Sequence, residues 1–366
     1  MFSFPISIVR ISCGALLLFS AAALGQELWL VSPVGFGPGQ RAMSGAALVS
    51  NKGALALASN PAEVASLRGL SVYASGDFSL SSLKLHEANT KYRFLARPQL
   101  AAAWRLPEGF AVGLAWGRGE LSAIESKAAG VSWRPVPLHR MLSNLAWELI
   151  PGFRLGAALQ LATTENASWT PGAETGAESW RGGRWAVATR AGLSVEVAPK
   201  RCTLALTWEE GLSLSSRRAW EAFGKLKTPH SLALAVWLGE AGSWEFEANL
   251  VYGWQRPQAD AARKAQAKED IFGARAGMGL WLTPVIQLRA GGAVFSHSPP
   301  AQPSWVQPMD AWSSSLSAGA LWRYGPMHAE VAWQMLAGFE SSKNPHPWVK
   351  QRISNLLSLG VGWNFH

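Results

Sequence analysis

Apolar and polar residues alternate along most of the chain. From Leu70 onward, segments of about ten residues place apolar side chains at every second position, with small or polar residues between them. In one such segment, Phe246 and Leu250 alternate with Glu247 and Asn249. A period of two is that of a β-strand with two unlike faces, and about ten residues is the length of a tilted strand that crosses a bilayer. The pattern therefore predicts a series of transmembrane β-strands.

The breaks between these segments alternate in length. Short turns lie at 107–109, 151–152, 199–200, 240–242, 283–284 and 324–326. Longer connections lie between them, at 81–91, 118–137, 164–183, 211–228, 255–270, 296–311 and 339–352. Short periplasmic turns, long outer loops and an even number of strands are typical of bacterial outer-membrane barrels. We therefore predict an all-β fold, a closed antiparallel transmembrane β-barrel of about fourteen strands.

The predicted strands are centred on 70–80, 97–105, 110–116, 145–149, 153–161, 185–197, 204–208, 232–238, 244–254, 278–282, 286–294, 316–322, 331–335 and 357–365. A soluble β-sandwich or propeller is the alternative fold. Neither would alternate its loop lengths in this way, and neither would place rows of Trp and Leu on its outer surface.

The stretch before the first strand has a different pattern. Residues 35–69 are apolar, yet frequent glycines interrupt any helical or strand period. An apolar segment without regular structure has to hide its backbone groups, because unpaired N–H and C=O groups are costly in lipid or in a dry core. A barrel of about fourteen strands has a lumen wide enough to need a plug or to hold water. We therefore expect residues 26–69 to form a plug inside a barrel of residues 70–366.

The same stretch carries an ordered set of motif residues. They are Gly37, Gly39, Arg41, Met43, Gly45 and Ala46, followed by Asn60, Pro61 and Ala62. This set resembles the N-terminal hatch of FadL-type outer-membrane transporters, which carry long-chain fatty acids and other hydrophobic molecules; the wider superfamily includes PorV-like barrels. The resemblance implies passive uptake through a lumenal pocket and a sideways exit through a gap at a kink in the third strand. Gly113 and Gly117 would permit that kink, with Asn60, Pro61 and Ala62 beside it.

The first 25 residues read as a secretory signal peptide. An apolar run follows Arg10 and ends in small residues, which predicts cleavage before Gln26. No later segment is apolar for long enough to predict a membrane-spanning helix. The 20 tryptophans and a charged fraction of only 16% favour a membrane boundary. The net charge of +9 suggests contact with outer-membrane lipids and lipopolysaccharide, and no nucleic acid partner is expected.

The lumen-facing positions are mostly small, with a few charges among them. Arg97, Arg190, Arg275 and Arg289 are candidates for holding a ligand carboxylate, because a guanidinium fork fits that group. The favoured alternative is that they pair with lumenal glutamates or bond to the hatch backbone. Within the 211–228 loop, Trp220 and Phe223 could lie on a short amphipathic helix at a ligand entry groove, or could anchor the loop in lipopolysaccharide.

Motifs for catalysis are lacking. The sequence contains no His-Glu-x-x-His, Cys-x-x-Cys or Gly-x-Ser-x-Gly, so neither a metal site, a cofactor nor an enzyme is predicted. We predict a monomeric outer-membrane transporter for fatty acids or other hydrophobic small molecules. The alternatives are a PorV-like structural or shuttle barrel, which would bind exported proteins through its outer loops, and an open porin.

Overall fold

The computed structural model describes most of the chain beyond the predicted signal peptide. The described ranges are 37–50, 52–85, 91–127, 130–164, 185–214, 226–227, 230–240, 242–255, 269–297, 312–339 and 349–365. The signal peptide predicted at 1–25 lies outside these ranges. Among the described residues, no helix has both the length and the apolar character needed to cross a membrane.

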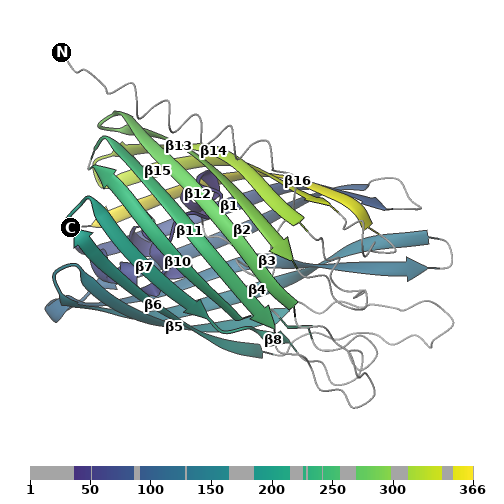
Figure 1. The fold of residues 1–366 in the computed structure, drawn as a ribbon, viewed down its shortest axis with the longest axis horizontal. Helices are drawn as coiled ribbons and strands as arrows, with labels where there is room; N and C mark the ends of the chain where they lie inside the picture. Colours follow the sequence, from purple (N-terminus) through teal and green to yellow (C-terminus); the bar gives the residue numbers. More distant parts are fainter. Residues whose placement is uncertain are drawn as a thin grey trace.

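Fourteen antiparallel strands close into a barrel (Figure 1). They are β1 (Leu70–Leu85), β2 (Lys91–Arg105), β3 (Phe110–Lys127), β4 (Gly130–Ile150), β5 (Phe153–Thr164), β6 (Trp185–Ala198), β7 (Cys202–Glu209), β10 (His230–Glu240), β11 (Trp244–Gln255), β12 (Glu269–Thr283), β13 (Ile286–His297), β14 (Trp312–Tyr324), β15 (Met327–Phe339) and β16 (Val349–Phe365). Each pairs with its neighbour in the chain, and β1 closes the barrel on β16, with Leu70 opposite Phe365. The predicted fold class is confirmed.

The two faces of the wall differ as the alternation predicts. Leu114 on β3 is 66% exposed on the outside, whereas its neighbour Ala115 is 6% exposed and faces inward. Large apolar side chains such as Leu100 and Leu250 cover the outer surface of other strands in the same way. Because no membrane-spanning structure other than a helix or a closed barrel satisfies its backbone in lipid, this apolar outer surface is that of a transmembrane barrel.

The strands are longer than predicted on the side of the long connections. The stretch 118–137 was expected to be a loop, and this expectation is wrong. β3 continues to Lys127 and β4 begins at Gly130, and the two pair without a register shift over their whole common length. Apolar and polar residues do not alternate over 118–137, so backbone hydrogen bonds hold a ribbon there that the sequence pattern does not reveal.

A second, smaller sheet lies in the 211–228 connection. β8 (Ser213–Leu214) pairs with β9 (Leu226–Lys227). The helix expected in this connection, with Trp220 and Phe223, falls on 215–225, outside the described residues.

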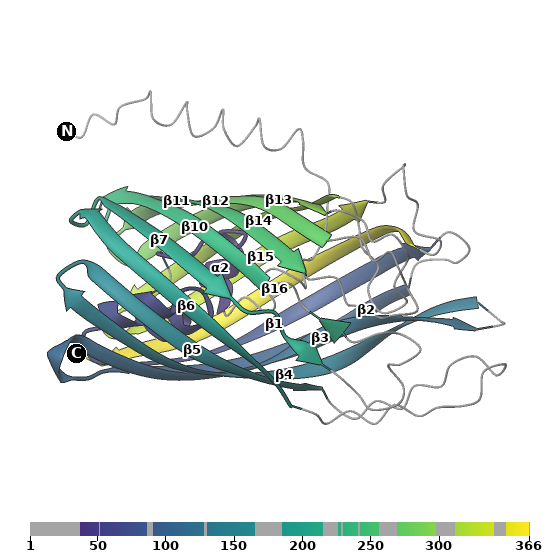
Figure 2. The ribbon, with the colours of Figure 1, turned by 60° about the horizontal axis from the view of Figure 1, so that its bottom comes forward.

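The described residues that precede β1, which begin at Gly37, lie inside the barrel (Figure 2), and residues 26–36 of the expected plug fall outside the described ranges. We call residues 37–69 the luminal segment. It consists of the short helix α2 (Gly37–Ala42) and the 3-10 helices η1 (Gly53–Ala58) and η2 (Pro61–Ser66), joined by turns. Most of its side chains are almost completely buried, including Met43 and Leu57. Small residues on the wall make room for it: a Cβ on Gly291 would lie 2.3 Å from the backbone of Met43.

The luminal segment touches the wall all the way round. α2, η1 and η2 pack against β1 to β6 and β13 to β16. Leu48 and Val49 form an apolar cluster with Ala205 on β7 and Ala235 on β10. Met43 reaches Gly277 on β12, and the backbone of 48–50 binds Glu247 on β11. At this level, therefore, protein fills the bore of the barrel.

Candidate functional site

A buried carboxylate holds the centre of the luminal segment. Glu247 on β11 is fully buried and accepts hydrogen bonds from three consecutive backbone N–H groups, those of Leu48 at 2.5 Å, Val49 at 3.2 Å and Ser50 at 2.8 Å. Successive N–H groups that converge in this way form an anion-binding concavity. The bonds satisfy backbone groups that have no regular secondary structure of their own.

Two further carboxylates hold α2. Asp77 on β1 is buried and pairs with Arg41 at 2.9 Å. It also accepts a hydrogen bond from Gln99 at 2.9 Å, and Gln99 in turn accepts one from the N–H of Gly37 at 2.8 Å. Glu330 on β15 accepts a hydrogen bond from the N–H of Gly39 at 3.2 Å. The motif residues Gly37, Gly39 and Arg41 are thus bound to the wall through polar contacts.

A fourth buried carboxylate belongs to the luminal segment itself. Glu63 in η2 is fully buried and pairs with Lys52 at 2.8 Å and with Arg154 on β5 at 3.2 Å. Ser194 on β6 also donates a hydrogen bond to it. Burial alone would raise the pKa of the Glu63 carboxyl, but Lys52 and Arg154 outweigh burial and hold this pKa below its usual value.

The Asn-Pro-Ala motif starts η2. The Asn60 side chain accepts a hydrogen bond from the N–H of Ala62 at 3.1 Å, so it caps this helix, and Pro61 occupies the first helical position. Two glycines of the wall leave space for the motif. A Cβ on Gly192 of β6 would lie 2.1 Å from Oδ1 of Asn60, and one on Gly156 of β5 would lie 2.3 Å from Pro61. The motif therefore lies against β5 and β6.

Gly113 and Gly117 lie on a different part of the wall. Gly113 on β3 faces Leu57 of the luminal segment, and a Cβ there would lie 2.4 Å from its methyl group. Gly117 is opposite Gln99 in the last residue pair between β2 and β3. Asn144 on β4, which is opposite Gly113, donates a hydrogen bond to the carbonyl of Pro61 at 3.3 Å, so one strand lies between Gly113 and the Asn-Pro-Ala motif.

The wall is not continuous beyond Gly117. In the described part of the chain, residues 91–98 of β2 pair only with β1, and residues 118–127 of β3 pair only with β4. We call these two facing edges the β2–β3 seam. β3 itself keeps an unbroken ladder with β4, so the separation arises where the β2–β3 ladder ends and not from a break within β3. Pro98, which has no N–H to donate, stands at this point of β2.

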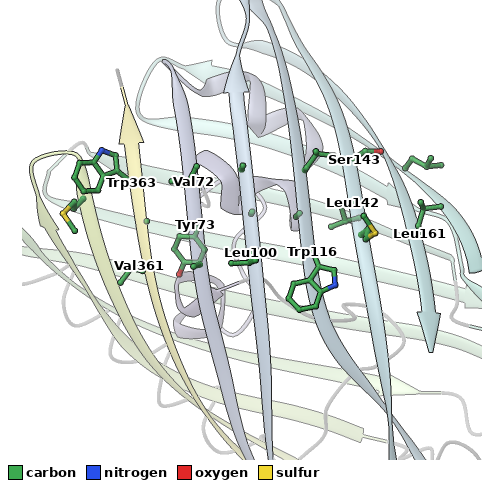
Figure 3. A pocket seen from close by; sticks show the side chains of 18 residues that line it. Val72, Tyr73, Leu100, Trp116, Leu142, Ser143, Leu161, Val361 and Trp363 are labelled. Carbon is green, nitrogen blue, oxygen red and sulfur yellow. The ribbon is translucent and has the colours of Figure 1, made fainter. Parts of the chain in front are cut away.

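A hollow in the outer surface lies at the base of the seam (Figure 3). Its volume is about 590 Å³, and it runs from β15 and β16 across β1, β2, β3 and β4 to β5. Leu100, Trp116, Met141 and Leu161 stand in one row across β2 to β5. Smaller side chains such as Ser143 leave the space between the larger ones. Because Leu100 and Met141 are about half exposed on the outside, the hollow opens toward lipid.

The candidate arginines face the lumen and are engaged within the protein. Arg190 donates to the carbonyl of Ala58 at 2.6 Å and pairs with Glu209 at 2.8 Å. Arg275 donates to the carbonyl of Gly45 at 3.2 Å. Arg289 pairs with Glu330 at 3.2 Å. Arg97 is buried and also interacts with other groups of the protein.

Comparison with known proteins identifies the fold. No protein-family model matches the sequence, and no curated protein matches it either. Among solved structures, a FadL homologue from Pseudomonas aeruginosa matches with a TM-score of 0.65 at 11% identity, covering 92% of this chain and 100% of its own. The chain has the FadL fold.

Two transporters with this fold match to a similar extent. The toluene transporter TodX from Pseudomonas putida gives a TM-score of 0.66 at 15% identity and covers 92% of this chain and 100% of its own. The toluene transporter TbuX from Ralstonia pickettii gives 0.58 at 15% identity, covering 91% and 99%. At such low sequence identities the similarity establishes the FadL fold but does not identify the ligand.

Within this FadL fold, sequence reasoning missed two residues that bind the luminal segment. Asp77 was not among the candidate residues, and Glu247 appeared only as one charge of an alternating strand. A usable signal did exist for both. Each is an acidic residue at an inward position of a strand whose outward positions are apolar, which implies a partner in the lumen.

Proposed function

We propose that the protein is an outer-membrane transporter that passively takes up hydrophobic small molecules and releases them sideways through the β2–β3 seam. The observation that carries this proposal is the combination of a filled bore with an incomplete wall. Residues 37–69 block the straight path to the periplasm, while the β2–β3 ladder ends at Gln99 and Gly117.

A sideways path suits a hydrophobic solute. A molecule that leaves through the wall enters hydrocarbon directly and avoids the cost of hydration that a water-filled channel would impose. The apolar hollow at the base of the seam lies on that path. Structures with the same fold include transporters of toluene, which is a hydrophobic small molecule.

In this proposal the luminal segment is the hatch. Asp77, Glu247 and Glu330 hold it in place by accepting its backbone or side-chain hydrogen bonds. The outer surface contacts outer-membrane lipids, and the protein acts as a monomer, because the seam and the lumen both belong to one chain.

Uptake and conductance measured together test the proposal. Cells that express the chain should take up the hydrophobic dye N-phenyl-1-naphthylamine faster than cells that lack it, by about tenfold or more. The purified protein in a planar bilayer should show no steady ion conductance, because the bore is filled. A steady conductance without faster dye uptake would contradict the proposal and favour a porin. Absence of both, together with recovery of an exported protein on the purified barrel, would favour the PorV-like alternative.

A further inference from the structure

A separate hollow lies in the outer surface across β10, β11, β12 and β13, which are neighbours in the wall (Figure 1). Its volume is about 510 Å³, and every side chain that lines it is uncharged. The small side chain of Ala274 on β12 leaves space between its ladder partners, Leu250 on β11 and Val294 on β13. Leu250 and Phe272 stand well exposed on the outer face, so this β10–β13 hollow opens toward lipid.

The β10–β13 hollow is separate from the lumen and from the β2–β3 seam. Phe295 on β13 is buried, and its ring lies so close to Gly273 on the inward side that a Cβ there would have no room. The wall is therefore closed between the hollow and the bore. In the order of strands β11 lies across the barrel from β2, so the hollow is also remote from the proposed exit.

A row of aromatic side chains stands at the outer end of this hollow. Trp254, next to the last residue of β11, stacks on His230 with ring centres 5.7 Å apart and on Tyr252 at 5.6 Å. Tyr252 in turn contacts Phe272 at 4.9 Å, and both line the hollow. Trp and Tyr rings favour the boundary between hydrocarbon and headgroups. The row therefore places the hollow in the outer leaflet, directly beneath the headgroups.

The outer connections next to this hollow are basic. The connection from β7 to β10 and the connection from β11 to β12 each contain more basic than acidic residues. Their basic residues are Arg217, Arg218, Lys225, Lys227, Arg256, Arg263, Lys264 and Lys268. The other outer connections, at 86–90, 128–129, 165–184, 298–311 and 340–348, together contain more acidic than basic residues. The positive charge of the outer connections is thus concentrated on those that join strands of the hollow.

We propose that these features together bind one molecule of a phosphorylated saccharolipid of the outer leaflet, the lipid A portion of lipopolysaccharide. From outside inward they follow the order of such a lipid: basic connections for the phosphates, the aromatic row for the sugars, and the hollow for an acyl chain. Basic residues attract the phosphates, and a chain that fills the hollow gains dispersion contacts with both of its sides. A phospholipid of the inner leaflet has its phosphate at the opposite end of the barrel and does not match this order.

Native mass spectrometry of the full-length protein in detergent tests the proposal. Bisphosphorylated lipid A and dioleoylphosphatidylglycerol are titrated separately, and the mass of each complex gives the number of lipids bound. A first molecule of lipid A should bind with an affinity at least about tenfold higher than that of phosphatidylglycerol. Equal affinities, or several lipid A molecules bound with no tight first one, would show only general contact with membrane lipids and would overturn the proposal.

A bulky substitution tests whether the acyl chain lies in the hollow. Ala274→Trp fills the space at a lipid-facing position, so the affinity for lipid A should fall at least about tenfold. Ala318→Trp places the same ring at an exposed position on β14, outside the hollow, and should leave the affinity unchanged. Lipid A binding to Ala274→Trp that equals wild type would contradict the proposal. A protein dimer that Ala274→Trp abolishes would assign the hollow to a second copy of the chain instead.

Charge substitutions test the contact with the phosphates. Arg263→Gln with Lys264→Gln removes positive charge from the connection between β11 and β12, and the affinity for lipid A should fall at least about tenfold. Arg181→Gln with Arg184→Gln removes the same charge from the connection between β5 and β6, and it should have little effect. An equal loss in both proteins would mean that net charge alone attracts the lipid, and the assigned site would be wrong.

Discussion

A covalent bridge across the β2–β3 seam is expected to abolish transport of a hydrophobic dye without unfolding the barrel. In the existing ladder Gln99 lies opposite Gly117 and Arg105 opposite Ala111. Continuing this register places residue 96 of β2 opposite residue 120 of β3. We therefore propose Ala96→Cys with Glu120→Cys in a Cys202→Ser background, joined by a short bismaleimide that can span separated strands. Uptake should fall by at least about tenfold, because the exit can no longer widen.

A second cysteine pair provides the control. Val331→Cys with Leu359→Cys joins two residues that already face each other in the β15–β16 ladder, on the outer face and outside the lining of the hollow. This bridge should leave uptake unchanged, and the folded fraction of both bridged proteins should equal that of wild type on an unheated gel. Equal uptake in the bridged seam and in the control would show that the ligand leaves elsewhere.

Loss of the Glu247 carboxylate is expected to have the largest effect on stability. Glu247→Ala leaves the N–H groups of Leu48, Val49 and Ser50 buried without their acceptor. Each buried N–H group without an acceptor costs about 1–3 kcal/mol. Water that enters the space left by the side chain offsets part of the summed cost of the three groups. The free energy of unfolding should fall by about 3 kcal/mol. Glu247→Gln keeps one acceptor oxygen and should lose less.

Urea titration in lipid vesicles, followed by tryptophan fluorescence, measures this loss. Glu240→Ala removes a glutamate of similar size at an exposed position on the neighbouring strand and should change the free energy by less than about 0.5 kcal/mol. Because Glu247 holds the luminal segment, Glu247→Ala should also raise ion conductance in a planar bilayer. If the Glu247→Ala protein is as stable as wild type and shows no increase in ion conductance, the other contacts suffice to hold the luminal segment.

The strands could be predicted from sequence because lipid enforces a simple rule. A residue such as Leu114 has to be apolar where it meets hydrocarbon, and its neighbour Ala115 has to be small where the luminal segment fills the bore. This rule holds for every strand within the bilayer. The alternation is absent from the ends of β3 and β4, and for that reason the ribbon that they form was taken for a loop.

The sequence predicted that lumenal side chains have bonding partners but not which residues those partners are. Inward arginines imply partners, but the choice of partner depends on positions far apart in the chain. Arg275, for example, binds the carbonyl of Gly45, and Arg190 that of Ala58. The alternation of apolar and polar residues shows whether a side chain faces lipid or the lumen. It does not show where along the barrel axis that side chain lies relative to the irregular luminal segment. Similarly, the position of Asn60 against Gly192 depends on how the luminal segment turns.

The resemblance implied a gap made by a kink in the third strand, and we propose the exit where the β2–β3 ladder ends. The expected kink would break β3 near its glycines. In the structure β3 remains paired with β4 throughout, and the ladder to β2 ends instead at the residue that follows Pro98. A proline in a strand was the available signal, since it removes a ladder hydrogen bond. The glycines provide space for the luminal segment, as Gly113 does for Leu57.

The route of the ligand can be read directly by photolabelling. A neutral 1-decanol analogue that carries a diazirine is bound to the protein in nanodiscs and irradiated, and the labelled peptides are identified by mass spectrometry. If the solute passes sideways out of a filled barrel, excess unlabelled decanol should suppress labels on 96–100 of β2 and 116–120 of β3. Competable labels near Arg289 and His328, at the periplasmic end of the bore, with none on these two strands, would contradict the account.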